Sequence, residues 1–191
     1  MKKAIFIVTI LFVAVISTAC LNNMAVQELN NAAKSYMDKG DYTSAIDRLE
    51  SSLELDKTVY ETHYNLGVAY IDDKQYQKAI DSLTNAIKLN SKYANTYYTL
   101  AIAQEKYADS LVFSNDGSDE ESYEEQTGEN GYKNVSSTVK EQMIECYLSS
   151  IANYKKYVDM VNSASKTEEV NAHIADMEKV LTKLGYTGSA Y

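Results

Sequence analysis

Apolar and small residues recur at helical spacing through residues 26–113, and the whole pattern returns after 34 residues. Within each unit the apolar positions are separated by steps of three and four, which places their side chains on one face of an α-helix. The recurring positions are Tyr36 and Tyr70, Tyr42 and Tyr76, Ala45-Ile46 and Ala79-Ile80, and Leu55 and Leu89. The pattern therefore predicts an all-α chain built from repeated pairs of helices.

A repeat of this length resembles the tetratricopeptide (TPR) family, in which each unit forms two helices. In this register the first repeat covers 26–59, the second covers 60–93, and the third begins at Ala94. The small-large-small positions of the second helices are Ala45, Leu49 and Ser52, then Ala79, Leu83 and Ala86. The resemblance implies a short TPR α-solenoid, and proteins of this family bind partners and rarely catalyse reactions.

The turns between the expected helices carry capping signals. Gly40 and Asp41 are expected to end one helix and cap the next. Thr58 and Glu61 have the spacing of a capping box at the start of the second repeat. One repeat after Gly40-Asp41, the turn is Lys74-Gln75, which departs from the family pattern.

The third repeat is interrupted by an acidic segment. Its first helix is expected to continue to Phe113, several residues past the family length. Residues 114–137 then hold seven acidic residues and three glycines against a single lysine. Such a segment has too little apolar surface to keep itself ordered, so we expect a mobile acidic loop.

Helical periodicity resumes in residues 138–185, which we expect to form a long helix and a C-terminal capping helix. Thr138 with Glu141, and Ser165 with Glu168, are the expected caps. The last helix has a polar outer face and is expected to cover the apolar end of the solenoid, before residues 186–191 fray. The expected buried stripes are Met143, Tyr147, Ile151, Tyr154, Val158 and Val161, then Val170, Ile174, Met177, Leu181 and Leu184.

The N-terminus has the layout of a bacterial export signal. Two lysines precede thirteen mostly apolar residues, 4–16, and this stretch is shorter than the roughly 20 residues that span a bilayer. Ser17-Thr18-Ala19-Cys20 resembles a lipobox, although Ser17 stands where the family usually has a branched apolar residue. The resemblance implies that residues 1–19 are a signal peptide and that Cys20 carries a lipid anchor. Cleavage after Ala19 without lipidation is the alternative. Residues 20–25 would then tether the repeats to the membrane, with at most about 18 Å of extended chain after Cys20.

The charge balance restricts the class of partner. The chain has 18 basic and 27 acidic residues, and removal of residues 1–19 lowers the net charge from −9 to −11. Nucleic acids and anionic headgroups require clusters of Lys and Arg, so we exclude nucleic-acid binding. A neutral or basic ligand is favoured over an acidic one.

The chain has few residues suited to catalysis. His63 and His173 have no second His or Cys at ligand spacing, and no nucleotide-binding or hydrolase motif occurs. Cys146 lies on a predicted apolar stripe, where a small buried side chain is favoured over a reactive thiol. The acidic segment lacks the residue order of an EF-hand, which leaves at most weak calcium binding. The sequence therefore predicts neither an enzyme nor a metal or cofactor site.

The candidate binding site is the concave face, which the first helices of the repeats are expected to form. Asn side chains there can bond to a peptide backbone, and Tyr and Ile can supply apolar pockets. The candidate binding residues are Asn31, Lys34, Tyr64, Asn65, Val68, Ile71, Tyr98 and Ile102, and Asn30, Asn95 and Thr99 lie on the same face. The alternative is that these side chains only face water or pack. TPRs that grip acidic chaperone tails use a carboxylate clamp on this face, and of its residues only Asn65 is matched here.

We therefore expect a lipid-anchored, non-catalytic adaptor that binds a protein or peptide at the bacterial cell envelope. The alternative is a self-associating structural module of the envelope without a peptide ligand. A monomer is favoured, and light scattering separates the two hypotheses.

Overall fold

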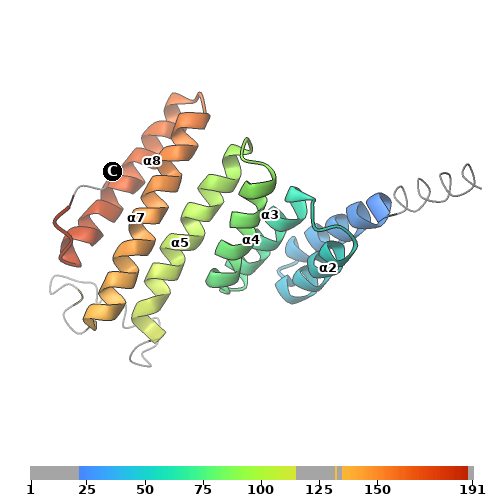
Figure 1. The fold of residues 1–191 in the computed structure, drawn as a ribbon, viewed down its shortest axis with the longest axis horizontal. Helices are drawn as coiled ribbons and strands as arrows, with labels where there is room; N and C mark the ends of the chain where they lie inside the picture. The colour runs from blue at the N-terminus through green and yellow to red at the C-terminus, as the bar shows by residue number, and fades with distance from the viewer. Residues whose placement is uncertain (1–21, 115–131, 133–134, 189–191) are drawn as a thin grey trace, which may run out of the picture.

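The computed structural model describes residues 22–114, 132 and 135–188, and every regular element in these ranges is a helix (Figure 1). Helices succeed one another side by side in chain order, from an N-terminal helix over residues 22–37 to the C-terminal pair (Figure 1). The others are α2 (Tyr42–Leu55), α3 (Tyr60–Asp72), α4 (Tyr76–Leu89), α5 (Ala94–Ser114), α7 (Ser137–Met160) and α8 (Ala164–Lys183). The expected all-α solenoid is confirmed.

The first two repeats pack through small residues that face leucines. Leu49 and Leu83, which are 34 residues apart, are both fully buried in one cluster with Ala33, Ala45 and further members of this stripe. Gly67 occupies the place of Ala33 in the second repeat. A Cβ added there would lie 2.4 Å from Leu83 Cγ, so α3 and α4 approach too closely for a larger residue. The backbone contact depends on this glycine.

The two equivalent turns differ in their chemistry. Gly40 has a φ of 75°, and Asp41 caps α2 by accepting a hydrogen bond from Ser44 N. One repeat later Lys74 takes the same left-handed conformation with a φ of 58°, and Gln75 caps α4 without a side-chain hydrogen bond. The sequence correctly placed both turns, and the second is the more strained because Lys carries a Cβ.

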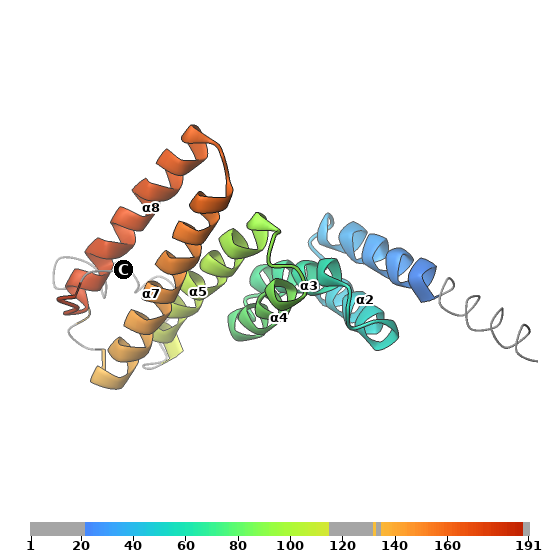
Figure 2. The same ribbon diagram turned by 45° about the horizontal axis from the view of Figure 1, so that its top comes forward.

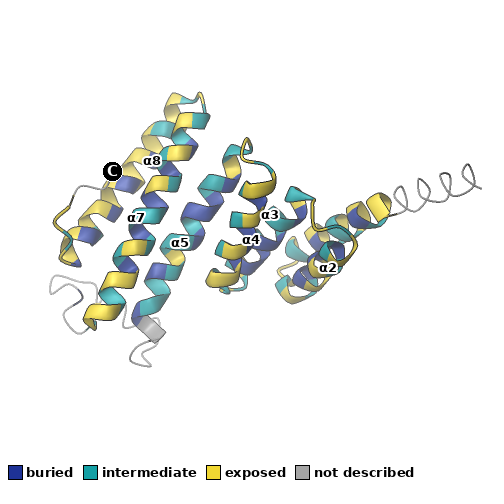
Figure 3. Ribbon diagram, in the orientation of Figure 1, coloured by how far each residue is buried: buried dark blue, intermediate teal, exposed yellow. Residues whose placement is uncertain are grey.

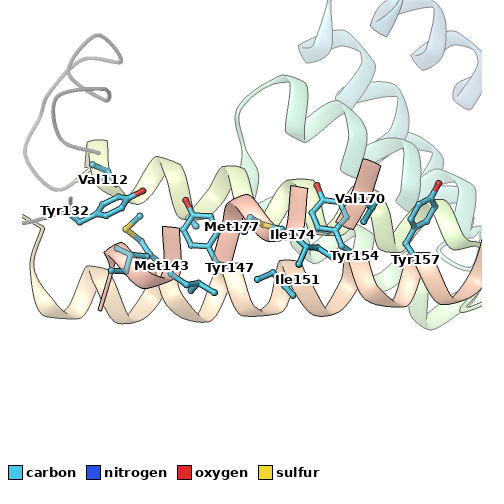
Figure 4. Close-up of a cluster of buried hydrophobic side chains, with 14 residues drawn as sticks. Val112, Tyr132, Met143, Tyr147, Ile151, Tyr154, Tyr157, Val170, Ile174 and Met177 are labelled. Atoms are coloured by element: carbon cyan, nitrogen blue, oxygen red, sulfur yellow. The ribbon is translucent and has the colours of Figure 1, made fainter. Parts of the chain in front are cut away.

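The C-terminal half has a second core built from long helices. The antiparallel helices α5 and α7 pack along their length (Figure 2), and Figure 4 shows Tyr147 and Tyr154 of α7 with their hydroxyls directed toward α5. The Tyr147 hydroxyl donates to Asp109, and the Tyr154 hydroxyl donates to Glu105 Oε2 over 3.4 Å. These side chains are otherwise buried, so each hydroxyl needs such a partner. The extended first helix of the third repeat supplies them.

Helix α8 covers α7 with its apolar stripe. Val170, Ile174, Met177 and Leu181 are buried, whereas the opposite side of α8 is exposed (Figure 3). Gly185 follows the helix with a φ of 92°, and Tyr186 N bonds back to Leu181 O. This arrangement agrees with the expected closing helix and its glycine stop.

Three expected caps are wrong. Thr58 bonds to Asp56 through its backbone N and its hydroxyl, and Val59 is the N-cap of α3. Helix α7 is capped by Ser136, which accepts from Val139 N, so the cap lies two residues before Thr138. Helix α8 begins after Ser163, again two residues before Ser165. The short polar residues near each helix start compete for the same role, and local pattern did not separate them.

Other details also differ from expectation. Tyr132, assigned to the mobile acidic loop, is buried in the C-terminal core, because a ring at the end of this segment reaches the apolar face of the helices. In α7 the buried ring after Tyr154 is Tyr157, and Val158 is half-buried. Residues 22–25, expected in the tether, are helical. Most of the acidic segment, the expected signal peptide over residues 1–19 and the expected lipidation site Cys20 lie outside the described residues. Within the described residues no helix is long and apolar enough to cross a bilayer.

Candidate functional site

A cavity of about 360 Å³ opens where three parts of the chain meet. Tyr64 of α3 and Tyr98 and Thr99 of α5 form one side, since Tyr64 and Tyr98 occupy the same position in successive repeats. Tyr157, at the end of α7, and the first turns of α8 form the other. The full lining is Tyr64, Asn95, Tyr98, Thr99, Tyr157, Lys166, Glu169 and Val170. We call this the groove cavity.

Tyr98 is the central aromatic residue of the groove cavity. Its ring centroid lies 5.0 Å from that of Tyr157 and 5.5 Å from that of Tyr154. Burial raises the pKa of the Tyr98 hydroxyl, and the nearby Glu169, Tyr157 and Glu105 raise it further, against the opposing charge of Lys166. The hydroxyl is therefore protonated at neutral pH and available as a hydrogen-bond donor.

The repeat side of the cavity carries uncharged polar groups, whereas its charged residues, Lys166 and Glu169, lie on α8. The Thr99 hydroxyl is 3.4 Å from the Tyr64 hydroxyl and donates over 2.9 Å to Asn95 O. The Asn95 side chain is exposed. Tyr64 also packs edge-on against Tyr93, with ring centroids 5.4 Å apart, which holds it at the rim. Amide and hydroxyl groups beside aromatic rings form a surface suited to a peptide.

Asn65 is used in packing between the first two repeats. Its Nδ2 donates to Asn30 Oδ1 over 3.2 Å. Asn30 Nδ2 lies 2.9 Å from each of Val26 O, Ser52 Oγ and Thr62 Oγ1, so its two hydrogens serve three acceptors. We call Asn30, Ser52, Thr62 and Asn65 the asparagine network. It joins the N-terminal helix, α2 and α3 and fills this part of the face.

Apart from Asn65, which belongs to the asparagine network, the sequence-predicted site residues fall into three groups. The groove cavity brings together Tyr64 and Tyr98, with Asn95 and Thr99 from the same face. Asn31 and Lys34 are exposed on the N-terminal helix and do not line it. Val68, Ile71 and Ile102 are half-buried, and the last two pack against the cores.

The α7 and α8 residues of the lining were not predicted. Tyr157 was missed because the stripe was continued with Val158, although a step of three from Tyr154 was equally compatible with helical spacing. Lys166, Glu169 and Val170 join the cavity only because α8 folds back over α7, and no local signal specifies that direction.

The residues suited to catalysis or metal binding, two histidines and a cysteine, do not form a common site. His63 Nε2 is 3.0 Å from Lys57 O, and His173 Nε2 is 2.8 Å from Glu105 Oε2. Cys146 is half-buried, and burial together with Glu145 raises the pKa of its thiol to about 11, which suppresses the reactive thiolate. No group of three potential metal ligands occurs among the residues that the structure describes.

The repeats are also identified by comparison with known families. The family model of the tetratricopeptide repeat matches residues 60–93, and a second TPR model matches residues 33–73. Residues 33–93 are TPR repeats. No curated protein matches the chain.

Solved structures with a similar fold are TPR domains. The first TPR of Spaghetti (RPAP3), bound to the HSP90 peptide SRMEEVD, is 16% identical, with a TM-score of 0.58 over 83% of this chain and 94% of that one. The Arabidopsis OM64 TPR domain is 12% identical, with a TM-score of 0.57 over 81% and 98%. The second TPR domain of human RPAP3, in complex with the HSP70 peptide SGPTIEEVD, is 11% identical, with a TM-score of 0.57 over 82% and 98%. At these identities the likeness establishes the TPR fold alone.

Proposed function

We propose that this chain is a non-catalytic adaptor that binds a segment of a partner protein in the groove cavity. The observation that carries the proposal is the cavity itself, which combines tyrosine rings, the hydroxyls of Tyr98 and Tyr157, the exposed amide of Asn95 and an open side. Two of the structural neighbours hold peptides in their TPR domains. Their peptides end in EEVD, and a ligand of that kind needs cations on the groove face.

The ligand of this chain differs in charge from those acidic tails. The groove cavity has one lysine, Lys166, and one carboxylate, Glu169, and the asparagine network occupies Asn65, the one matched clamp residue. The full chain carries a net charge of −9. A neutral or basic segment therefore fits better than an acidic one, because an acidic tail would be repelled without compensating contacts.

The test is affinity capture with the full-length chain from native membranes. Asn95 is exposed and lines the cavity, so Asn95→Trp should fill the groove without disturbing the core. Asn85 is exposed on α4 and does not line the cavity, and Asn85→Trp is the matched control. We expect a set of partners that Asn95→Trp loses and Asn85→Trp retains. Identical sets for the two variants would contradict binding in the groove.

The second part of the proposal is attachment to a bacterial membrane through a lipid on Cys20. Because residue 22 is already helical, only residue 21 stands between Cys20 and the described solenoid, so the adaptor would work close to the lipid surface. Mass spectrometry of the N-terminal peptide should detect a diacylglyceryl group on Cys20, and Cys20→Ala should move the protein from the membrane to the soluble fraction. A plain cleaved N-terminus at Cys20 would contradict the anchor.

A further inference from the structure

A second cavity of about 250 Å³ adjoins the groove cavity. The two share Tyr98, Glu169 and Val170 in their linings, so they lie next to each other. The added lining comes from Tyr154 of α7 and from Ala172, His173 and Asp176 of α8. We call this the ring cavity, because aromatic rings form its walls.

The rings of this cavity are arranged edge to face. Tyr98 meets Tyr154 at 72°, and Tyr154 meets His173 at 88° with ring centroids 5.3 Å apart. In such arrangements the faces of some rings stay open, and the π face of a tyrosine is electronegative. Tyr154 is only 2% exposed, so the tyrosine face that the ring cavity offers to a cation is chiefly that of Tyr98, which is half-buried.

Two tyrosines of α7 contact carboxylates of α5, but the next tyrosine along α7 contacts a tyrosine instead. Tyr147 meets Asp109, and Tyr154 meets Glu105, but continuing the antiparallel register brings Tyr157 to Tyr98. Neither the Tyr98 nor the Tyr157 hydroxyl has a hydrogen-bond partner within the part of the chain described, although Tyr157 is only 5% exposed. Two hydroxyls are thus left for a ligand at the junction of the cavities.

The charges around the ring cavity are unequal. Asp176 pairs with Lys179 at the exposed surface, and Glu105 contacts His173 and Tyr154. Glu169 borders both cavities and has no ion-pair partner among the described residues. Lys166 is the one lysine in either lining, and it stands on the groove side.

We propose that the ring cavity binds a basic side chain, lysine or arginine, of the segment held in the groove cavity. This inference rests on the proposed peptide-binding function and specifies its ligand. The ammonium or guanidinium group would lie against Tyr98, Tyr154 and His173 and pair with Glu169, while its aliphatic stem passes Val170. An acidic side chain in the same position would meet two carboxylates and the negative ring faces.

The experiment is selection of a random heptapeptide library on the full-length chain. We expect the enriched peptides to carry Arg or Lys at one fixed position. Replacing that Arg with citrulline, or that Lys with norleucine, keeps the size and removes the charge. This should weaken binding at least about tenfold, in the range of a partly desolvated cation–π and charge contact.

Glu169→Gln and Glu168→Gln form a matched pair of variants. Both residues are exposed and lose the same charge, but only Glu169 lines the cavities. We expect Glu169→Gln to abolish most of the preference for the charged peptide, and Glu168→Gln to retain it.

The outcomes separate the two proposals. Peptides that are enriched without a fixed basic residue, or that bind equally after loss of charge, would overturn the basic anchor and leave the groove in place. Equal effects of the two glutamate variants would also overturn it, since they would indicate long-range attraction only. A selection that enriches the same peptides on Asn95→Trp, or none at all, would overturn the groove and the anchor together.

Discussion

The same repeat position does different work in successive repeats. Asn30 in the first repeat corresponds to Tyr64 in the second and Tyr98 in the third. Asn30 is consumed by the asparagine network, which fills its part of the face with hydrogen bonds. Tyr64 and Tyr98 instead stand at the walls of the groove cavity. The comparison shows that polar packing closes this face at the first repeat, whereas the face at the second and third repeats is left open for a ligand.

One of the two residues that surround this position changed with it, and the other did not. Ser52 and Thr62 of the asparagine network correspond to Ala86 and Thr96 one repeat later. The Thr96 hydroxyl is buried and has no hydrogen-bond partner within the described ranges, because the asparagine that would serve it has become Tyr64. A buried hydroxyl without a partner costs stability. The open end of the groove is therefore the less well satisfied of the two interfaces.

The largest effect should come from Asn30→Ala. This change leaves Ser52, Thr62 and Asn65 with lost partners at an interface of three helices. We expect a loss of about 2 to 3 kcal/mol in the free energy of unfolding, measured by urea unfolding followed by circular dichroism. Asn31→Ala, at an exposed neighbouring position, is the control and should change little. Equal effects of the two variants would mean that the network does not stabilise the first interface.

Gly67→Ala should be the next most disruptive change. The new methyl group would overlap Leu83, at a cost of about 1 to 3 kcal/mol that the better helix propensity of Ala only partly offsets. In a Leu83→Ala background the same substitution should cost nothing, because the clash is absent. Thermal unfolding of the original chain, the two single variants and the double variant gives the coupling energy between the two positions. Additive effects would mean that Gly67 and Leu83 are not in tight contact.

Lys74→Gly should stabilise the second repeat by about 1 kcal/mol, since it removes the Cβ from a left-handed residue. Lys74→Ala removes the side chain but keeps the Cβ, and it should give no such gain. Gly40→Ala, where a Cβ meets no atom within 4 Å, should cost about the same amount in the first repeat. Chemical denaturation curves of the three variants measure these changes in stability. A gain in stability from Lys74→Ala would show that the Cβ of Lys74 is not the source of strain in the second turn.

The smallest effect is expected at Thr96. Thr96→Val deletes the unpartnered hydroxyl at nearly constant shape and should leave stability unchanged or raise it by up to about 1 kcal/mol. Thr62→Val, one repeat earlier, deletes a hydroxyl that Asn30 uses and should lower stability by about 1 kcal/mol. A comparable loss at both positions, read from melting temperatures, would show that Thr96 is satisfied in solution.

Much of the architecture could be predicted because the repeat encodes it locally. The period of 34, the small residues opposite Leu49 and Leu83, and the turn at Gly40 each follow from contacts within one or two adjacent helices. The third repeat's extended helix was also foreseen from its continuing stripe to Phe113. Cap positions were less certain, because neighbouring Ser, Thr and Asp residues offer competing hydrogen bonds.

The residues of the candidate site also divide into those that the repeat predicts and those that the tertiary packing decides. Tyr64 and Tyr98 were recognisable from the sequence, since equal repeat positions must share a face. The hydrogen bond from Asn65 to Asn30 was decided by the packing of α3 against the N-terminal helix. That Tyr157 rather than Val158 turns inward, and that Glu169 borders both cavities, were decided by how α7 and α8 pack. The packing of the repeats follows from the sequence, because each repeat contacts a neighbour with the same residue pattern. Helix α8 is not part of the repeated pattern, so the residues that it contacts are decided only when the whole chain is packed.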